Sequence, residues 1–346
     1  MSVPAKCSTQ ANGSLRANAT TQAGGSNEPG GAPSTLPEIA PTANYAPIRE
    51  WLRRGEVAIL DGAIGTEILR RDVTWADHQV LDRPTVIRAI HEDYVRAGAD
   101  IISTNTFQLT RRTLFNHFRD EAHRRHVGPP DLDDRAERLL RAAVSLAVEA
   151  RDAAANGRPV AVAGAITTIE WCFRPDLAPP PELARAEYRE TIATLADAGC
   201  DLVLIETVNS VGEAVAAVQA ANDVGLPSWV AFVPNERGHL FTDETLAQAE
   251  AALAPLGPDA ILLNCAPPDD CRAGLRELAA ARSAATGIYP HVGRFDPPEW
   301  LFTDEYPPDR YLAEARGWVQ MGARVVGGCC GTTPEHIRAL ASALRS

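Results

Sequence analysis

The stretch DRYLAEARGWVQMGARVVGGCC, residues 309–330, decides the fold. Its first part, 309–322, has a helical period and ends at a glycine, and its second part, 323–330, is a short apolar strand. The same pairing of a helical segment with a short run rich in Val, Ile and Leu recurs from residue 57 onward. Eight strands are predicted in this way, at residues 57–62, 99–107, 160–166, 201–208, 228–234, 260–266, 287–293 and 323–330.

This repetition predicts an α/β fold, a (β/α)8 TIM barrel over residues 46–346. Eight parallel strands and their helices over roughly 250 to 300 residues fit a closed barrel better than an open doubly wound sheet. No Gly-x-Gly-x-x-Gly pattern follows the first strand, as a dinucleotide-binding sheet would require. The least regular part is 108–159, where we expect a solvated excursion before a helix over 134–154.

Composition narrows the class of protein. The 346 residues contain no apolar run near the ~20 that a membrane span needs. A formal charge of −12 disfavours nucleic acid and acidic membrane surfaces as partners. Residues 1–45 are rich in Ser, Thr, Asn, Gly, Pro and Ala, which predicts a disordered N-terminal extension. Seven cysteines, an odd count in a long chain, favour a reducing, cytoplasmic location with thiols kept for chemistry.

Polar residues gather where the predicted strands end. The active site of such a barrel lies at the C-terminal ends of its strands, so residues there are candidates for function. They are Asp61, Asn105, Thr106, Glu206, Thr207, Asn264, Cys265, His291, Cys329 and Cys330.

Three of these are thiols on neighbouring strand ends, Cys265, Cys329 and Cys330. Three thiolate ligands with one open position form a plausible catalytic zinc site, because structural sites are closed by four ligands. The glycines at 327, 328 and 331 would let the backbone bend so that adjacent cysteines reach one ion. Three alternatives remain: buried apolar thiols, a disulfide between the adjacent cysteines, and a phosphate site at the start of the helix that follows Thr333.

Five segments carry a family resemblance: LDGAIGTEILRR (60–71), AGADIISTNTFQ (97–108), LIETVNS (204–210), LLNCAPP (262–268) and GARVVGGCCGTTPEHIRAL (322–340). In this order they resemble the homocysteine S-methyltransferase family, which includes betaine–homocysteine methyltransferase, over residues 47–346. The resemblance implies a zinc-dependent barrel that methylates the homocysteine thiol to give methionine.

Carried over by position, the resemblance implies Cys265, Cys329 and Cys330 as zinc ligands. It implies that Glu206 holds the substrate ammonium, and that Asp61 and Gly62 position the amino-acid end. Asn105, Thr106 and His291 are further candidates for substrate binding at the strand ends.

The chain departs from the family pattern at three places. Ala63 replaces the second of two glycines in the first turn, AITTIEWCFRPD (165–176) replaces a Gly-Pro after the third strand, and PHVG (290–293) replaces a Pro-Asn pair in the seventh. His291 is therefore expected to be a hydrogen-bonded residue, an added substrate contact or a fourth zinc ligand.

The methyl donor is expected to be an onium compound such as betaine, S-methylmethionine or another sulfonium. Aromatic faces attract such cations, and Trp75, Phe107, Trp171 and Phe173 are candidates for this contact, although they also suit packing under loops. Two other functions remain open: a zinc barrel that activates water for hydrolysis, and a thiol sensor without transfer.

Overall fold

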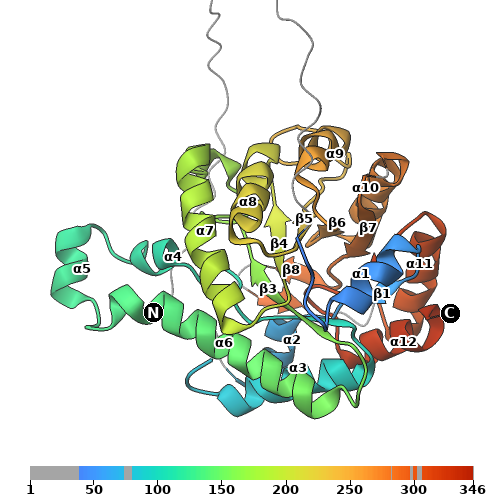
Figure 1. The fold of residues 1–346 in the computed structure, drawn as a ribbon, viewed down its shortest axis with the longest axis horizontal. Coiled ribbons are helices and arrows are strands. Elements are labelled where there is room, and N and C mark those ends of the chain that lie inside the picture. Colours follow the sequence, from blue (N-terminus) through green and yellow to red (C-terminus); the bar gives the residue numbers. More distant parts are fainter. Residues whose placement is uncertain (1–38, 74–79, 282, 297–298, 302–305, 346) are drawn as a thin grey trace, which may run out of the picture. The chain divides into compact units, whose positions relative to one another are not determined.

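A computed structural model describes residues 39–73, 80–281, 283–296, 299–301 and 306–345, which belong to one compact unit (Figure 1). The helices are α1 (Ala46–Arg53), α2 (Ile64–Arg70), α3 (Pro84–Ala97), α4 (Arg111–Phe115), α5 (Glu121–Val127), α6 (Leu132–Ala154), α7 (Pro181–Ala198), α8 (Val211–Val224), α9 (Leu246–Leu253), α10 (Pro268–Ala281), α11 (Pro308–Gln320) and α12 (Pro334–Leu344). The strands are β1 (Ala58–Ile59), β2 (Ile101–Ser103), β3 (Ala161–Ile166), β4 (Leu202–Val208), β5 (Ser228–Phe232), β6 (Ala260–Asn264), β7 (Ala285–Tyr289), β8 (Arg294–Asp296), β9 (Glu299–Leu301) and β10 (Val325–Val326).

The main sheet is a closed barrel, as the sequence predicted. Its eight strands are parallel and follow the order β1-β10-β7-β6-β5-β4-β3-β2. The two ends of this order meet through a bridge between Leu60 and Ile101, where the Asp61 N–H donates to the Ile101 carbonyl at 3.0 Å. All eight predicted strands are thus confirmed, with β10 as the eighth of the barrel.

Two apolar layers hold the barrel together. Side chains such as Leu204, Trp229 and Leu262 fill the interior, while Val203, Val230 and Leu263 point outward to the helices. This in-and-out alternation is what a strand buried on both faces requires. The helices stop where expected, because Gly98, Gly199 and Gly225 adopt the left-handed conformation that ends α3, α7 and α8.

Residues just before 46, the first residue of the predicted barrel, also contact the barrel. Tyr45 is fully buried among the interior residues of the barrel, where its hydroxyl accepts a hydrogen bond from Trp229 Nε1 at 2.7 Å and donates to Asp259 at 2.9 Å. Thr42 is hydrogen-bonded to Asp201. Tyr45, a single aromatic residue at the edge of a polar segment, gave no strong sequence signal. Together with α1 it packs against the interior residues of the barrel.

The irregular segment before β3 contains helices. α4 and α5 stand to one side of the barrel and the long α6 follows them, as expected for an excursion before a helix (Figure 1). An antiparallel hairpin, β8 and β9, lies between β7 and α11 and was not predicted.

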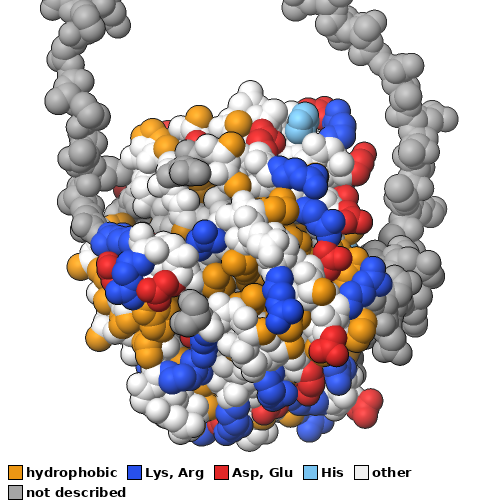
Figure 2. All heavy atoms as spheres, turned by 90° about the vertical axis from the view of Figure 1, so that its right-hand side faces the viewer, with side chains coloured by type: hydrophobic (Ala, Val, Ile, Leu, Met, Phe, Trp, Pro, Cys, Tyr) orange, Lys and Arg blue, Asp and Glu red, His pale blue; other side chains and the backbone are white. Residues whose placement is uncertain are grey.

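The surface carries both signs of charge despite the formal charge of −12. Acidic and basic side chains are interspersed on the face shown in Figure 2. Among the residues that the structure describes, no helix is both long and apolar enough to cross a bilayer.

Candidate active site

The structure brings the three predicted thiols together at the C-terminal end of the barrel. Cys265 follows β6, and Cys329 and Cys330 follow β10. The Sγ atom of Cys265 lies 2.9 Å from that of Cys329, which lies 4.0 Å from that of Cys330. All three side chains are partly exposed, so a small molecule can reach them.

The thiols shift one another's ionisation. The hydrogen bond to Cys265 holds the pKa of Cys329 well above its usual value, while the hydrogen bond from Cys329 lowers the pKa of Cys330. Neighbouring sulfurs cannot all become anionic without a compensating cation, because each negative charge disfavours the next. The cluster is therefore a set of donors that suits a metal ion.

The backbone around Cys265 is strained in a way that aims its side chain. Cys265 and Thr207 adopt positive φ angles of 50° and 61°, which residues other than glycine rarely do. The Thr207 hydroxyl donates to Cys265 Sγ at 3.5 Å, and its N–H donates to Asn264 Oδ1 at 3.2 Å. The His291 ring hydrogen-bonds the backbone of Cys265, and burial lowers the pKa of this histidine. In this conformation His291 supports Cys265 through the main chain.

The glycines around the cysteine pair serve two different purposes. Gly331 has a φ of +88°, and a Cβ atom there would lie 1.9 Å from the Val292 carbonyl oxygen. Gly327 and Gly328 do not have positive φ; a Cβ atom would meet Leu60 at 2.7 Å and Thr332 at 2.3 Å. One glycine therefore supplies the bend, and the other two permit close packing.

Replacing Gly331 with alanine is expected to lower the free energy of unfolding by about 2–4 kcal/mol, because the new methyl group adds a steric clash to a left-handed backbone. Thermal unfolding measures the loss. Gly212→Ala is the matched control, since nothing lies within 4 Å of its Cβ position, and it should change stability by less than about 1 kcal/mol. Equal stability of both variants would contradict the strained geometry.

The donor set fits a soft cation, although the side chains must adjust to receive it. A tetrahedral zinc with Zn–S bonds of about 2.3 Å holds two sulfurs about 3.8 Å apart, and the separations of 2.9 and 4.0 Å lie on either side of that value. Within the described part of the chain, no three His, Cys, Asp or Glu side chains already stand in metal-binding geometry.

The alternatives for the cysteine pair find less support. The six cysteines in the described ranges are all free thiols, including Cys329 and Cys330. The loop amides that a phosphate would need already have partners: the Gly331 N–H donates to Thr66 Oγ1 at 2.9 Å, and the Thr332 N–H donates to the Cys329 carbonyl at 3.1 Å. Thr332 is fully buried, which leaves no open cradle at this helix start.

Glu206, at the end of β4, faces the same mouth. It is partly exposed, and the Tyr289 hydroxyl donates to its Oε2 at 3.2 Å. Burial raises the pKa of Glu206 to about 7, and the hydrogen bond from Tyr289 only partly opposes this shift. Its charge also acts on the thiols of Cys330 and Cys172. Among the described residues no Lys, Arg or His forms an ion pair with Glu206, so its carboxylate can receive a cation from a ligand.

Asp61 and Gly62 lie beneath the mouth. Asp61 is 2% exposed, and its carboxylate accepts hydrogen bonds from the Ser103 N–H at 2.8 Å and hydroxyl at 3.0 Å. Its carbonyl accepts from the Gly328 N–H at 3.0 Å. A Cβ on Gly62 would lie 2.8 Å from Thr332 Oγ1. Asp61 thus joins β1, β2 and the cysteine loop, and burial raises its pKa.

Asn105 and Thr106 are both 2% exposed. Thr106 donates to the Ala165 carbonyl at 2.6 Å and shares a hydrogen bond with Thr104. The structure therefore directs Thr106 toward β3, inside the wall of the barrel. Its hydroxyl is already committed to structural contacts.

A family model described as homocysteine S-methyltransferase matches residues 58–344, from β1 to α12. The chain belongs to this family. Consistent with that, "Homocysteine S-methyltransferase YbgG" of Bacillus subtilis is 28% identical over 87% of this chain and 98% of its own length. "Selenocysteine Se-methyltransferase" of Brassica oleracea var. italica is 28% identical over 85% of this chain and 90% of its own.

A solved structure agrees with the family in fold. The homocysteine methyltransferase MmuM from Escherichia coli, in a metallated form, matches with a TM-score of 0.71 and 28% identity, covering 86% of this chain and 99% of that one. This member of the homocysteine S-methyltransferase family is therefore an enzyme of the methyltransferase class with the same barrel.

Of the four aromatic residues predicted to face a donor, the structure describes Phe107, Trp171 and Phe173. Trp75 lies outside the described residues, and Phe107 is partly buried. Trp171 is 60% exposed. Phe173 packs edge-on against Phe241, with ring centroids 5.5 Å apart. The structure thus gives an aromatic rim after β3 and β5, and Phe241 is the member that the sequence did not indicate.

Sequence reasoning missed three polar contributors to the mouth. Tyr289 hydrogen-bonds Glu206, Ser103 hydrogen-bonds Asp61, and Cys172 contacts Thr167 just after β3. Tyr289 had a usable signal, because it is the last residue of β7 and pairs in register with Asn264. Cys172 had none, since its place depends on how the loop after β3 folds.

Proposed function

We propose that this enzyme transfers a methyl group from an onium donor to the thiol of homocysteine, giving methionine, with zinc held by Cys265, Cys329 and Cys330. The observation that carries the proposal is the convergence of three partly exposed thiols at the strand ends where Glu206, hydrogen-bonded to Tyr289, also lies. Zinc, when bound, removes the proton from a substrate thiol whose pKa is otherwise near ~8.5. The named relatives, methyltransferases of homocysteine and selenocysteine, support this reaction.

The residues of the chain orient the acceptor. Glu206 receives the substrate ammonium, with Tyr289 holding the carboxylate in place through its 3.2 Å hydrogen bond. Asp61 fixes the β1 and β2 ends and, through Gly328, the cysteine loop. His291 and Thr207 fix Cys265. Asn105, which follows β2, is a further candidate for contact with the substrate, and Thr106 supports that end of the site through its hydrogen bond to the Ala165 carbonyl.

The reaction balances without a protein base. The thiolate sulfur forms a bond to the methyl carbon while the bond from that carbon to the donor's nitrogen or sulfur breaks. The leaving amine or sulfide keeps the electron pair and becomes neutral. Three thiolates give the metal site a net negative charge, so a fourth thiolate there stays electron-rich.

A donor panel tests the proposal. Purified protein is expected to contain about one zinc per chain and to methylate homocysteine with betaine, S-methylmethionine or another sulfonium. Metal analysis followed by methionine assays with each onium donor, S-adenosylmethionine and methyl-folate gives the answer. The proposal would be refuted if the enzyme were active without zinc, or if it bound homocysteine but formed no methionine with any donor. Turnover of an ester or amide without a thiol would indicate a hydrolase instead.

A further inference from the structure

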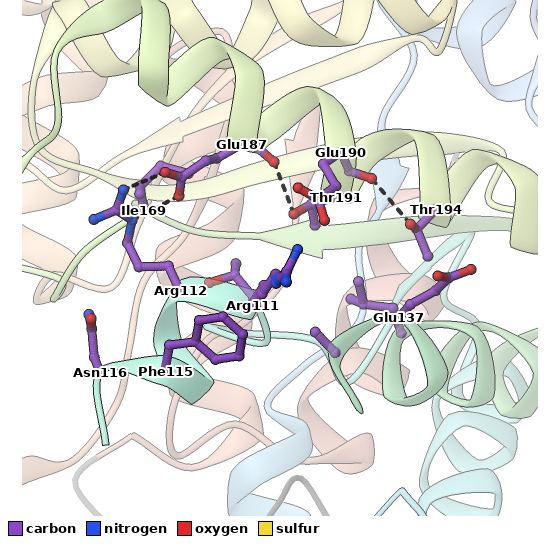
Figure 3. Close-up of a pocket in the computed structure, with 13 residues that line it drawn as sticks. Arg111, Arg112, Phe115, Asn116, Glu137, Ile169, Glu187, Glu190, Thr191 and Thr194 are labelled. Carbon is purple, nitrogen blue, oxygen red and sulfur yellow. Dashed lines mark hydrogen bonds and ion pairs between the residues drawn. The ribbon is translucent and has the colours of Figure 1, made fainter. Parts of the chain in front are cut away.

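The loop after β3, residues 167–173, is anchored to the body of the barrel from two sides. On one side the Glu170 carboxylate accepts hydrogen bonds from Arg112 Nη1 and Asn116 Nδ2, both at 3.0 Å. Arg112 reaches from α4 to Glu187 on α7 with its Nε atom at 2.8 Å, as Figure 3 shows. Gln108 Nε2 donates to the Glu170 carbonyl at 3.3 Å.

On the other side the loop is tied to α7 and α8. The Ile169 N–H donates to Glu213 Oε1 at 2.7 Å, and the Tyr188 hydroxyl donates to the same oxygen at 2.9 Å. Tyr188 also lies 3.2 Å from the Thr167 carbonyl. So many contacts on one short loop fix its conformation.

In this conformation Cys172 is partly buried, while its neighbours Trp171 and Phe173 are exposed. Cys172 Sγ is 3.0 Å from Thr167 Oγ1 and accepts from Gln108 Nε2 at 3.5 Å. It is partly exposed, and its partner Thr167 directly follows Ile166, which pairs with Ile205 in the β3–β4 register. Thr167 therefore ends β3 beside the β4 end that carries Glu206, which places Cys172 at the ammonium end of the proposed acceptor site.

The residues that flank Cys172 form the outer rim. Phe173 has a φ of +68°, which reverses the chain, and it is 47% exposed against Phe241. We propose that Cys172 forms the wall against which the methyl donor binds and thereby selects the donor, and that Arg112 positions this wall through Glu170. This inference rests on the proposed methyl transfer.

A neutral wall suits an onium donor. Burial raises the pKa of Cys172 to about 11, so the group stays a thiol at neutral pH. Transfer of a methyl group from an onium to a thiolate cancels a positive and a negative charge. A fixed anion against the donor would stabilise the charged reactants more than the less charged transition state, and would slow the step. A neutral, polarisable sulfur avoids that cost.

Enlarging the side chain tests the wall. Cys172→Met is expected to raise the KM of the preferred onium donor at least tenfold, while zinc content and the Kd of homocysteine stay within about twofold. Cys172→Ser, which keeps the size, should leave the donor KM within about threefold. Cys172→Ala should shift the ratio of kcat/KM between S-methylmethionine and the smaller trimethylsulfonium at least fivefold. If Cys172→Met does not fold, the Cys172→Ser and Cys172→Ala variants still test the inference.

Arg112→Met tests the positioning role, with the donor KM expected to rise about fivefold and the homocysteine Kd unchanged. Combined with Cys172→Met, its effect should be less than the product of the two, because both act through one loop. An unchanged donor KM in Cys172→Met, or an equal rise in the homocysteine Kd, overturns the inference while the proposed function stands. Absence of turnover with every donor in the wild-type enzyme refutes the proposed function and the inference with it.

Discussion

Replacing Cys330 with alanine is expected to abolish tight metal binding and to lower homocysteine methylation by about a thousandfold or more. The reason is that two thiolates bind a soft cation much less well than three, and an unbound substrate thiol is mostly protonated at neutral pH. The Sγ atom of Cys330 lies 4.0 Å from that of Cys329, so the substitution removes one of the three sulfur donors. Metal analysis and initial rates with a saturating donor measure both effects.

The control for this variant is Cys200→Ala. Cys200 is 4% exposed and belongs to the apolar layer between the barrel and the helices. Losing its sulfur should cost about 1 kcal/mol of stability and leave metal content and kcat unchanged. A Cys330→Ala enzyme that keeps its zinc and full activity would show that the thiol cluster is not the metal centre.

The barrel could be predicted from sequence because its signals are local. Each strand is a short apolar run, and helices such as α3 and α7 stop at glycines that adopt a left-handed conformation. The thiol cluster could also be predicted from the sequence. Once strands are assigned, Cys265 and Cys329 fall at C-terminal strand ends, and those ends share one mouth.

What the sequence missed depends on contacts between distant residues. Tyr45 looks like the end of a polar segment until it meets Trp229, 184 residues away. Asp61 is expected to help position the amino-acid end of the substrate, and the hydroxyl that holds its carboxylate belongs to Ser103, 42 residues away. Cys172 is turned inward by a loop that Arg112 and Glu213 hold. None of these pairings leaves a periodic pattern in the chain.

Glu206, which is proposed to bind the substrate ammonium, is expected to reduce the stability of the fold. Its pKa is about 7 in the folded protein against 4.5 for an ordinary glutamate. The folded state therefore holds this proton more tightly than the unfolded state, and stability falls as pH rises from about 4.5 to 7 and then stays level. Because the side chain is partly exposed, the penalty above pH 7 is about 1–3 kcal/mol.

Glu206→Gln is accordingly expected to lower kcat/KM for homocysteine about a hundredfold at pH 8, while it raises the free energy of unfolding by about 1–3 kcal/mol there and hardly at all at pH 5. The loss of activity follows because an amide cannot neutralise the buried ammonium of the acceptor. In the wild-type enzyme kcat/KM should fall about tenfold per pH unit below pH 7, since the protonated acid cannot bind that ammonium, and the variant should lack this dependence.

The matched control for Glu206→Gln is Glu190→Gln, which removes an exposed carboxylate on α7 and should change neither quantity. Chemical denaturation and initial rates at both pH values give the two readouts. If Glu206 binds the ligand and destabilises the fold, Glu206→Gln raises the free energy of unfolding at pH 8 and lowers kcat/KM. A variant that loses stability at pH 8 and keeps its affinity for homocysteine would assign Glu206 to the structure of the β4 and β7 ends through Tyr289, and not to substrate binding.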